Sequence, residues 1–312
     1  MASDSTGTSL TQQLLRKACD IQPEETRATL SSFLLVLILM GSYYILRPVR
    51  DAMASDWTDA EVSWLWTATF VLSFFAVSLY GTAVTRVRFQ RLVPSVYTFF
   101  AASFVLFYVG TQALEERTLL DKSFYVWISL FSLFHISVFW SFMADTFSKP
   151  QALRLFGFIG AGASIGGLVG PAVTALFVQD VGTDGLLLVA AAIIVVTPPL
   201  VGWIQRLKRA DLHNEDVSAD SSDFEYIGGN PLAGFSALLS SRFLLGIGLF
   251  IFFYTSISSF VYFELKNLLA DFDRETRSQI WAGMDLAVNS ITVVVAAFAT
   301  GRIAKYMGLP FT

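Results

Sequence analysis

The chain alternates between long apolar runs and short polar segments over most of its length. Each run holds about 16 to 25 residues, enough for an α-helix to cross a hydrocarbon core roughly 30 Å thick. The runs are continuously apolar rather than alternating, so they predict helices and not the strands of a membrane barrel. Eight such runs occur, over residues 28–46, 64–85, 92–114, 123–144, 155–179, 185–205, 243–263 and 280–301.

Polar segments divide these predicted helices into domains. Residues 1–27 form a leader that lacks the pattern of a cleaved signal peptide, and we expect it to be cytoplasmic. Residues 206–242 include an acidic, serine-rich stretch and predict a flexible cytoplasmic linker. We therefore expect an all-α, polytopic membrane protein with a six-helix bundle over residues 28–205 and two helices of a second bundle over residues 243–312.

Composition and charge placement agree with a membrane protein. Only 15% of the residues are charged, whereas a soluble protein carries about a quarter. With the N-terminus in the cytoplasm, fourteen of the 21 Lys and Arg residues fall on the cytoplasmic side. This bias predicts a multi-pass protein of the cell membrane with a cytoplasmic N-terminus. Arg47 and Arg50 are two of the seven basic residues that run against it.

Charged residues follow directly on the first apolar run. Arg47, Arg50 and Asp51 fall at its far end, where a charge inside the membrane would cost a few kcal/mol. Arginine binds carboxylate or phosphate through two donors, so these residues predict a binding site for an organic anion. The alternative is that Arg47 reaches to the membrane interface while Arg50 and Asp51 pair in a loop. Pro48 favours this alternative because proline ends or bends a helix.

The end of the seventh run partly repeats the end of the first. The order of aromatic and charged residues that begins with Tyr43 and Tyr44 recurs in part at Tyr262, Glu264 and Lys266. We assign all five to the predicted substrate site. The tyrosine rings would stack on a ring-bearing substrate, or else anchor their helices at the membrane interface.

Other polar residues inside predicted helices are candidates for coupling or gating. His135 is expected either to carry a coupling proton or simply to hydrogen-bond a neighbouring helix. Asp145 is expected to form a gating salt bridge with Arg154 or with the basic loop after the second run. Asp285 and Asn289 lie one turn apart on one helical face, which we expect to point into the bundle.

A pattern of glycine followed by basic residues occurs twice, 220 residues apart. The second run ends at Gly81 with Arg86 and Arg88 close behind, and the eighth ends at Gly301 with two basic residues behind it. Such internal repeats indicate two related bundles. The motif resembles the first signature of the major facilitator superfamily of secondary transporters, although Thr85 stands where that family usually has aspartate.

The fifth run strengthens the resemblance. Gly157, Gly166, Gly170 and Pro171 fit the glycine-proline motif of that superfamily's fifth helix, which is loosely associated with exchangers. Physically, glycines allow a second helix to pack closely and proline permits a bend, so plain tight packing is the alternative. The resemblance implies twelve helices that rock around a central site. We therefore expect this chain to be truncated after its eighth helix.

A narrower resemblance points to the ATP/ADP (nucleotide) translocases of bacteria and plastids. Residues 43–51 resemble their first-helix signature, with Arg50 in place of a functionally important lysine. Residues 139–157 resemble the junction of their fourth and fifth helices. Two glutamates of those translocases fall at Ile128 and near Tyr262, which argues for relatedness rather than for a shared substrate.

The leading hypothesis is an alternating-access transporter for an anionic metabolite, with nucleotide exchange as its most specific form. The alternative is a non-transporting membrane protein, such as a sensor, a scaffold or a decayed paralogue, on a transporter fold. No phosphate-binding loop, zinc-protease motif or hydrolase serine motif occurs, and one cysteine and two histidines make a metal site improbable. We expect no enzyme activity, no cofactor and no nucleic-acid partner, only the lipid bilayer and a small anion.

Overall fold

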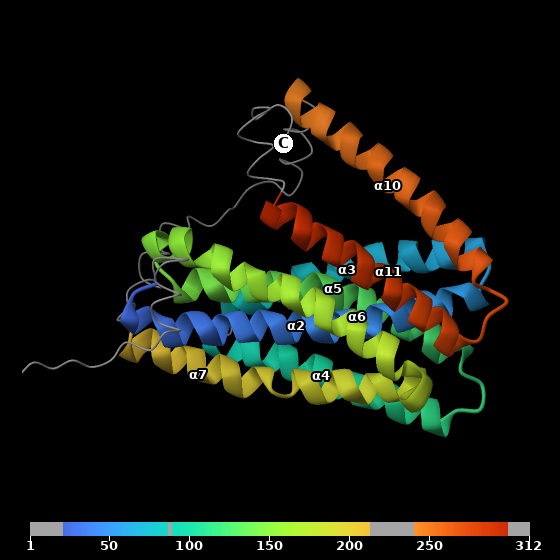
Figure 1. Ribbon diagram of the computed structural model, residues 1–312, viewed down its shortest axis with the longest axis horizontal. Coiled ribbons are helices and arrows are strands. Elements are labelled where there is room, and N and C mark those ends of the chain that lie inside the picture. The colour runs from blue at the N-terminus through green and yellow to red at the C-terminus, as the bar shows by residue number, and fades with distance from the viewer. Residues whose placement is uncertain (1–20, 87–88, 213–239, 299–312) are drawn as a thin grey trace, which may run out of the picture.

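The structure, a computed structural model, describes residues 21–86, 89–212 and 240–298 (Figure 1). Throughout these ranges it is helical and contains no strand, which confirms the predicted all-α class. Six of the described helices are long and apolar enough to cross a membrane. The elements are η1 (Pro23–Glu25), α2 (Thr26–Met53), η2 (Ala54–Asp56), α3 (Asp59–Arg86), α4 (Phe89–Ala113), α5 (Thr118–Thr146), α6 (Lys149–Ile194), α7 (Thr197–Ala210), α10 (Arg242–Leu268) and α11 (Arg274–Phe298).

Helix α2 lies at the centre of the bundle, where it packs along α6 and also contacts α5, α7 and α11. It continues to Met53 with Pro48 inside it, so of the two effects expected of Pro48, an end or a bend of the helix, the end is wrong. Proline has no N–H to donate to the carbonyl four residues earlier. Just beside this gap, the Thr174 hydroxyl of α6 donates to the carbonyl oxygen of Ile45 at 3.0 Å. Contact with α6 therefore helps to hold the proline-containing turn.

Glycines allow α6 to approach α2 so closely. A Cβ atom on Gly166 would lie 2.6 Å from the carbonyl oxygen of Leu37, and one on Gly170 would lie 2.5 Å from that of Gly41. A Cβ on Gly162 would also meet backbone at 2.5 Å. These three glycines follow one another every four residues on one face of the helix. They account for the tight α2–α6 contact as small residues do in other membrane proteins.

One detail of the predicted glycine-proline motif differs from the structure. Gly157 is exposed, and among the described residues no atom comes within 4 Å of a Cβ placed on it, so it is not a packing glycine. The interruption of α6 lies at Gly182, with φ 70° and ψ 167°, between the fifth and sixth predicted runs. Because positive φ is easy only for glycine, Gly182 separates the fifth helical segment from the sixth.

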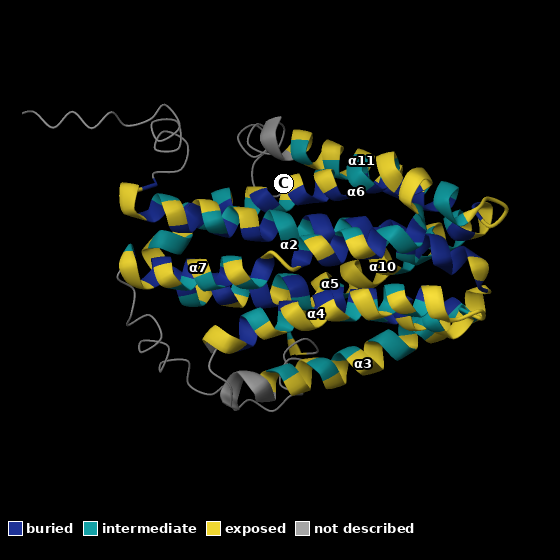
Figure 2. Ribbon diagram, turned by 90° about the horizontal axis from the view of Figure 1, so that it is seen from below, coloured by how far each residue is buried: buried dark blue, intermediate teal, exposed yellow. Residues whose placement is uncertain are grey.

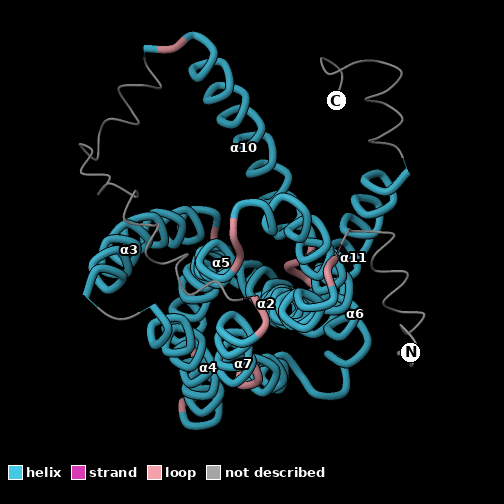
Figure 3. Tube along the Cα trace, turned by 90° about the vertical axis from the view of Figure 1, so that its left-hand side faces the viewer, coloured by secondary structure: helices cyan, strands magenta, loops and turns pink. Residues whose placement is uncertain are grey.

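The last two helices join the others at one end of the bundle. This end, here called the η2 end, holds η2, Gly182 and the turn between α10 and α11. From it α11 runs back along α6 and α2, whereas α10 diverges from the bundle (Figures 1 and 3). Figure 2 shows how exposed α3 and α10 are, and their most apolar windows are only 6% and 0% buried. Such surfaces suit contact with lipid rather than water.

Candidate functional site

The charged residues of α2 form the core of the candidate site. Arg50 donates from Nε and Nη2 to Oδ1 of Asp51 at 2.9 and 2.7 Å, and its Nη1 lies 3.4 Å from the Ser129 hydroxyl of α5. The Arg50 guanidinium also lies over the Tyr125 ring, 5.5 Å from its centroid. The Asp51 side chain is only 2% exposed. Arg50 and Asp51 thus form a buried pair inside a helix, and the alternative of a loop ion pair is wrong.

Arg47 connects this pair to the second half of the chain. Its Nη1 lies 3.0 Å from Oδ1 of Asp285 on α11, and its Nε lies 3.7 Å from Oδ2 of Asp51. Arg47 thus contacts one carboxylate on its own helix and one on α11. Arg47 therefore does not simply reach to the interface, and Asp285 faces the bundle interior as predicted from its sequence.

Tyr262 adds α10 to the same group. Its hydroxyl donates to Oδ1 of Asp51 at 3.3 Å and lies 3.2 Å from the Tyr125 hydroxyl, which in turn accepts from Nε1 of Trp66 at 2.7 Å. A chain of hydrogen bonds thus links α3, α5, α10 and α2. We call Arg47, Arg50, Asp51, Tyr262 and Asp285 the central cluster. Trp66, Tyr125 and Ser129 were missed because polar atoms on aromatic or small side chains are common in membrane helices.

The central cluster is electrically balanced. Two guanidinium groups face two carboxylates, and isolated charges at this depth would be costly. Arg47 lies six residues before the end of α2, about 9 Å along the helix, and Asp285 lies eleven residues into α11, about 16 Å. The cluster is therefore inside the bundle, on the η2 side of its middle.

Four further predicted site residues surround this cluster. Tyr44 places its ring 5.6 Å from the Arg47 guanidinium, and Tyr43 stacks on the ring of His135 at 5.0 Å. Asn289 donates to the carbonyl oxygen of Asp285 and touches α6 at Gly167. These four residues therefore lie where α2 meets α5 and where α11 meets α6.

His135 itself has a structural environment. It is buried, its Nδ1 donates to the carbonyl oxygen of Phe131 at 2.9 Å, and its Nε2 lies 3.3 Å from the Met40 sulfur. Among the described residues, no carboxylate is paired with it. The hydrogen bond to Phe131 lies within α5 itself, so the predicted bond to a neighbouring helix and the predicted proton-carrying role both stay predictions.

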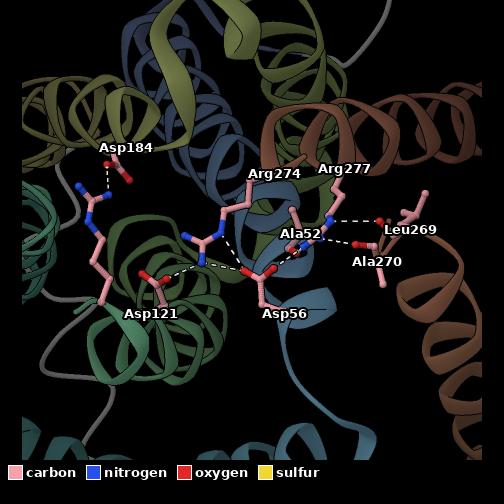
Figure 4. Close-up of polar contacts among 9 residues, drawn as sticks. Ala52, Asp56, Asp121, Asp184, Leu269, Ala270, Arg274 and Arg277 are labelled. Carbon is pink, nitrogen blue, oxygen red and sulfur yellow. Dashed lines mark hydrogen bonds and ion pairs between the residues drawn. The ribbon is translucent and has the colours of Figure 1, made fainter. Parts of the chain in front are cut away.

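A second charged group closes the η2 end (Figure 4). Arg274 at the start of α11 bridges Asp56 of η2 at 2.7 Å and Asp121 of α5 at 2.6 Å. Arg277 pairs with Asp56 and also donates to the carbonyl oxygens of Leu269 and Ala270. We call Asp56, Asp121, Arg274 and Arg277 the clasp. It joins α11 to the first half of the chain, and sequence reasoning missed all four residues.

The remaining charged predictions lie at the two ends of the bundle. Lys266 is 1% exposed, but it donates to the carbonyl oxygen of Trp57 and pairs with Asp59, so it is not part of the central cluster. Glu264 is exposed, with no partner recorded among the described residues. Lys266 lies one turn beyond Tyr262 on the same face of α10, but it contacts Trp57 and Asp59 instead of the central cluster. Both assignments to the substrate site are therefore corrected to positions outside the central cluster.

At the opposite end of the bundle Asp145 has a partner that was not predicted, and its gating role stays a prediction. Asp145 pairs with Lys208 of α7 at 3.0 Å, and Arg154 pairs with Glu25 at 2.7 Å. Both pairs tie helices of the first bundle to one another, so neither joins the two halves.

The glycine-basic loop motif lies only partly within the described residues. Gly81 is exposed, and among the described residues no atom from another part of the chain lies within 4 Å of a Cβ placed on it. Arg86 ends α3, while Arg88 and Gly301 lie outside the described residues.

The apolar helices and the buried charges between them define a polytopic helical membrane protein. The family model of the Major Facilitator Superfamily matches residues 32–312, so the chain belongs to that superfamily and is, in general terms, a secondary transporter. Neither the search of curated proteins nor the search of solved structures returned a match. The narrower resemblance to nucleotide translocases, and the expected truncation, stay predictions.

Proposed function

We propose that this protein carries a small organic anion across the membrane by alternating access, and that Arg47 binds the acidic group of the anion. The observation that carries the proposal is the Arg47–Asp285 pair. It places an arginine between the two halves of the chain, deep in an apolar bundle. A buried charge at such a junction is expected to serve function, because stability alone would be better served by apolar packing.

Arg47 is a better candidate than Arg50 for direct contact. The Arg50 guanidinium is held by Asp51 through two donors and by Ser129 through a third, and its side chain is 14% exposed. The Arg47 side chain is 33% exposed and holds each carboxylate through a single contact. Arg47 thus has donors left to offer a ligand. Arg50 and Asp51 then hold Arg47 in place.

Two features support a transport cycle. The clasp joins α11 to η2 and α5 at the η2 end, while α10 diverges from the bundle toward the other end (Figures 1 and 4). In the rocking-bundle scheme, one side is closed while the other opens. With the N-terminus in the cytoplasm, the η2 end faces outward, and the clasp is the outer gate of the cell-membrane protein.

A nucleotide, moved by exchange, is the first substrate to test. Arginines bind phosphate well, and aromatic rings lie over both guanidinium groups, that of Tyr44 over Arg47 and that of Tyr125 over Arg50. A phosphorylated or carboxylated anion that carries a flat ring would use both features.

The test is uptake into proteoliposomes of radiolabelled ADP, inorganic phosphate and succinate, each with and without the same anion inside. We expect saturable uptake of at least one probe, and a loss of about tenfold or more in Arg47→Ala. Arg117→Ala is the matched control, because Arg117 is similarly exposed (39%) and pairs with Asp184 away from the central cluster. Unchanged uptake in Arg47→Ala would remove Arg47 from the mechanism.

The same balanced charges also favour the alternative of a non-transporting membrane protein, because every guanidinium of the cluster already has a carboxylate partner. If the wild type is neither stabilised against heat by any probe nor able to take one up, the alternative holds.

A further inference from the structure

We propose that Asp285 is an internal counterion: its carboxylate occupies the position at Arg47 that the acidic group of the transported anion takes. The anion then binds by displacing Asp285. This inference rests on the proposed function and assigns Asp285 a specific role in it, that of setting how tightly the anion binds.

The first argument is the difference between the two carboxylates of the central cluster. Asp51 accepts hydrogen bonds from Arg50 and Tyr262 and also pairs with Arg47, and its side chain is 2% exposed. Asp285 has one recorded ionic partner among the described residues, Nη1 of Arg47, and its side chain is 12% exposed. Asp285 is thus the carboxylate that leaves at the smaller cost in hydrogen bonds.

The second argument is where Asp285 is attached. Asp51 lies on the same helix as both arginines and follows them in any movement. Asp285 lies on α11, in the second half of the chain, and reaches Arg47 across the contact between α11 and α2. A shift of α11 relative to α2 therefore separates Asp285 from Arg47 and leaves Asp51 in place.

The third argument is charge. The cluster holds two cations and two anions, so a bound anion adds a negative charge that no further cation among Arg47, Arg50, Asp51 and Asp285 offsets. Binding becomes favourable when Asp285 moves away with α11, because the anion then restores the balance of two positive and two negative charges in the cluster. A ligand carboxylate or phosphate oxygen offers Arg47 the same acceptor that Asp285 offers, so the exchange conserves the hydrogen bond.

The experiment measures binding of ADP and of inorganic pyrophosphate to purified full-length protein in nanodiscs by calorimetry. We expect Asp285→Asn to bind the better probe about tenfold more tightly than the wild type, since its amide competes poorly for a guanidinium. In Asp285→Asn/Arg47→Gln the gain should disappear. Asp184→Asn is the matched control, because it also removes a carboxylate from an arginine, Arg117, but at the η2 end beside the clasp and outside the central cluster (Figure 4). Its affinity should equal that of the wild type.

Thermal unfolding separates this role from a merely structural one. Asp285→Asn leaves Arg47 with only the longer contact to Asp51, so the variant should melt below the wild type, and the probe anion should restore the lost stability. Asp285→Glu keeps the charge and should bind as weakly as the wild type. If Asp285→Asn does not fold, Asp285→Ser tests the same point.

The outcomes are distinct for the inference and for the function. Equal or weaker binding by Asp285→Asn, together with wild-type binding that Arg47→Gln abolishes, overturns the counterion role but leaves Arg47 as the anion site. Absence of binding in both the wild type and Asp285→Asn overturns the inference and the proposed function together.

Discussion

Replacement of Gly166 by alanine should destabilise the contact between α2 and α6. The added Cβ would lie 2.6 Å from the carbonyl oxygen of Leu37, 2.9 Å from the amide nitrogen of Gly41 and 2.9 Å from Cβ of Met40. None of these atoms can move without moving α2. Overpacking of this kind costs about 1–3 kcal/mol, and backbone contacts this short belong in the upper part of that range. Loss of glycine's extra conformational entropy returns about 0.5–1 kcal/mol, so we expect a net loss of about 2 kcal/mol.

Gly157→Ala is the matched control on the same helix. No described atom lies within 4 Å of its Cβ position, so only the gain of about 0.5–1 kcal/mol remains. The two variants should therefore differ by about 2–3 kcal/mol. The assay is equilibrium unfolding of the purified protein in mixed detergent micelles, followed by tryptophan fluorescence. Equal free energies of unfolding for the two variants would show that α2 and α6 are not packed as closely as described.

Two further substitutions test the ends of α10 and α11. Arg277→Ala removes the clasp residue that contacts Asp56 and two carbonyl oxygens of the α10–α11 turn, so the η2 end should open. The reporter is a cysteine at the fully buried Ser278 in a Cys19→Ser background, which should react about tenfold faster with an impermeant maleimide. An unchanged rate would show that the clasp is not a gate. Lys266→Met should lower the free energy of unfolding by only about 1–2 kcal/mol, because its partner Asp59 is 57% exposed and stays hydrated. It should leave anion affinity unchanged, and a lost affinity would return Lys266 to the binding site.

Sequence reasoning found most of the central cluster for a physical reason. Lipid has no means to solvate a charge, so Arg47, Arg50, Asp51 and Asp285 had to face the interior wherever their helices packed. What the sequence could not supply was the pairing. Resemblance to the translocases singled out Arg50. In the structure, however, Arg50 is bound by Asp51, and the Arg47 side chain is the more exposed of the two. The exposure of an arginine side chain depends on which helices pack beside it, and the pattern of apolar and polar residues does not determine that packing.

The clasp was missed because its residues lie where charges are ordinary. Asp56, Asp121, Arg274 and Arg277 fall in or beside predicted loops, where charged residues carry no functional signal. The two residues of a pair in the clasp lie up to 221 positions apart in the sequence. In the structure α11 begins at Arg274, six residues before its predicted apolar run, so Arg277 lies within the helix and is buried. The packing glycines are equally hard to predict, because the sequence alone does not show which glycines of α6 face α2.

Helix α11 connects the proposed gate to the proposed binding site. Its first turn carries Arg274 and Arg277 of the clasp, and Asp285 follows about 12 Å further along the helix than Arg277. One more turn on, Asn289 rests against Gly167 of α6, a smooth position without a side chain to interlock. A helix moves as a rigid unit over such a distance, so the clasp does not open without some displacement of Asp285 relative to Arg47. By the same linkage, an anion that displaces Asp285 acts on the helix that holds the clasp closed.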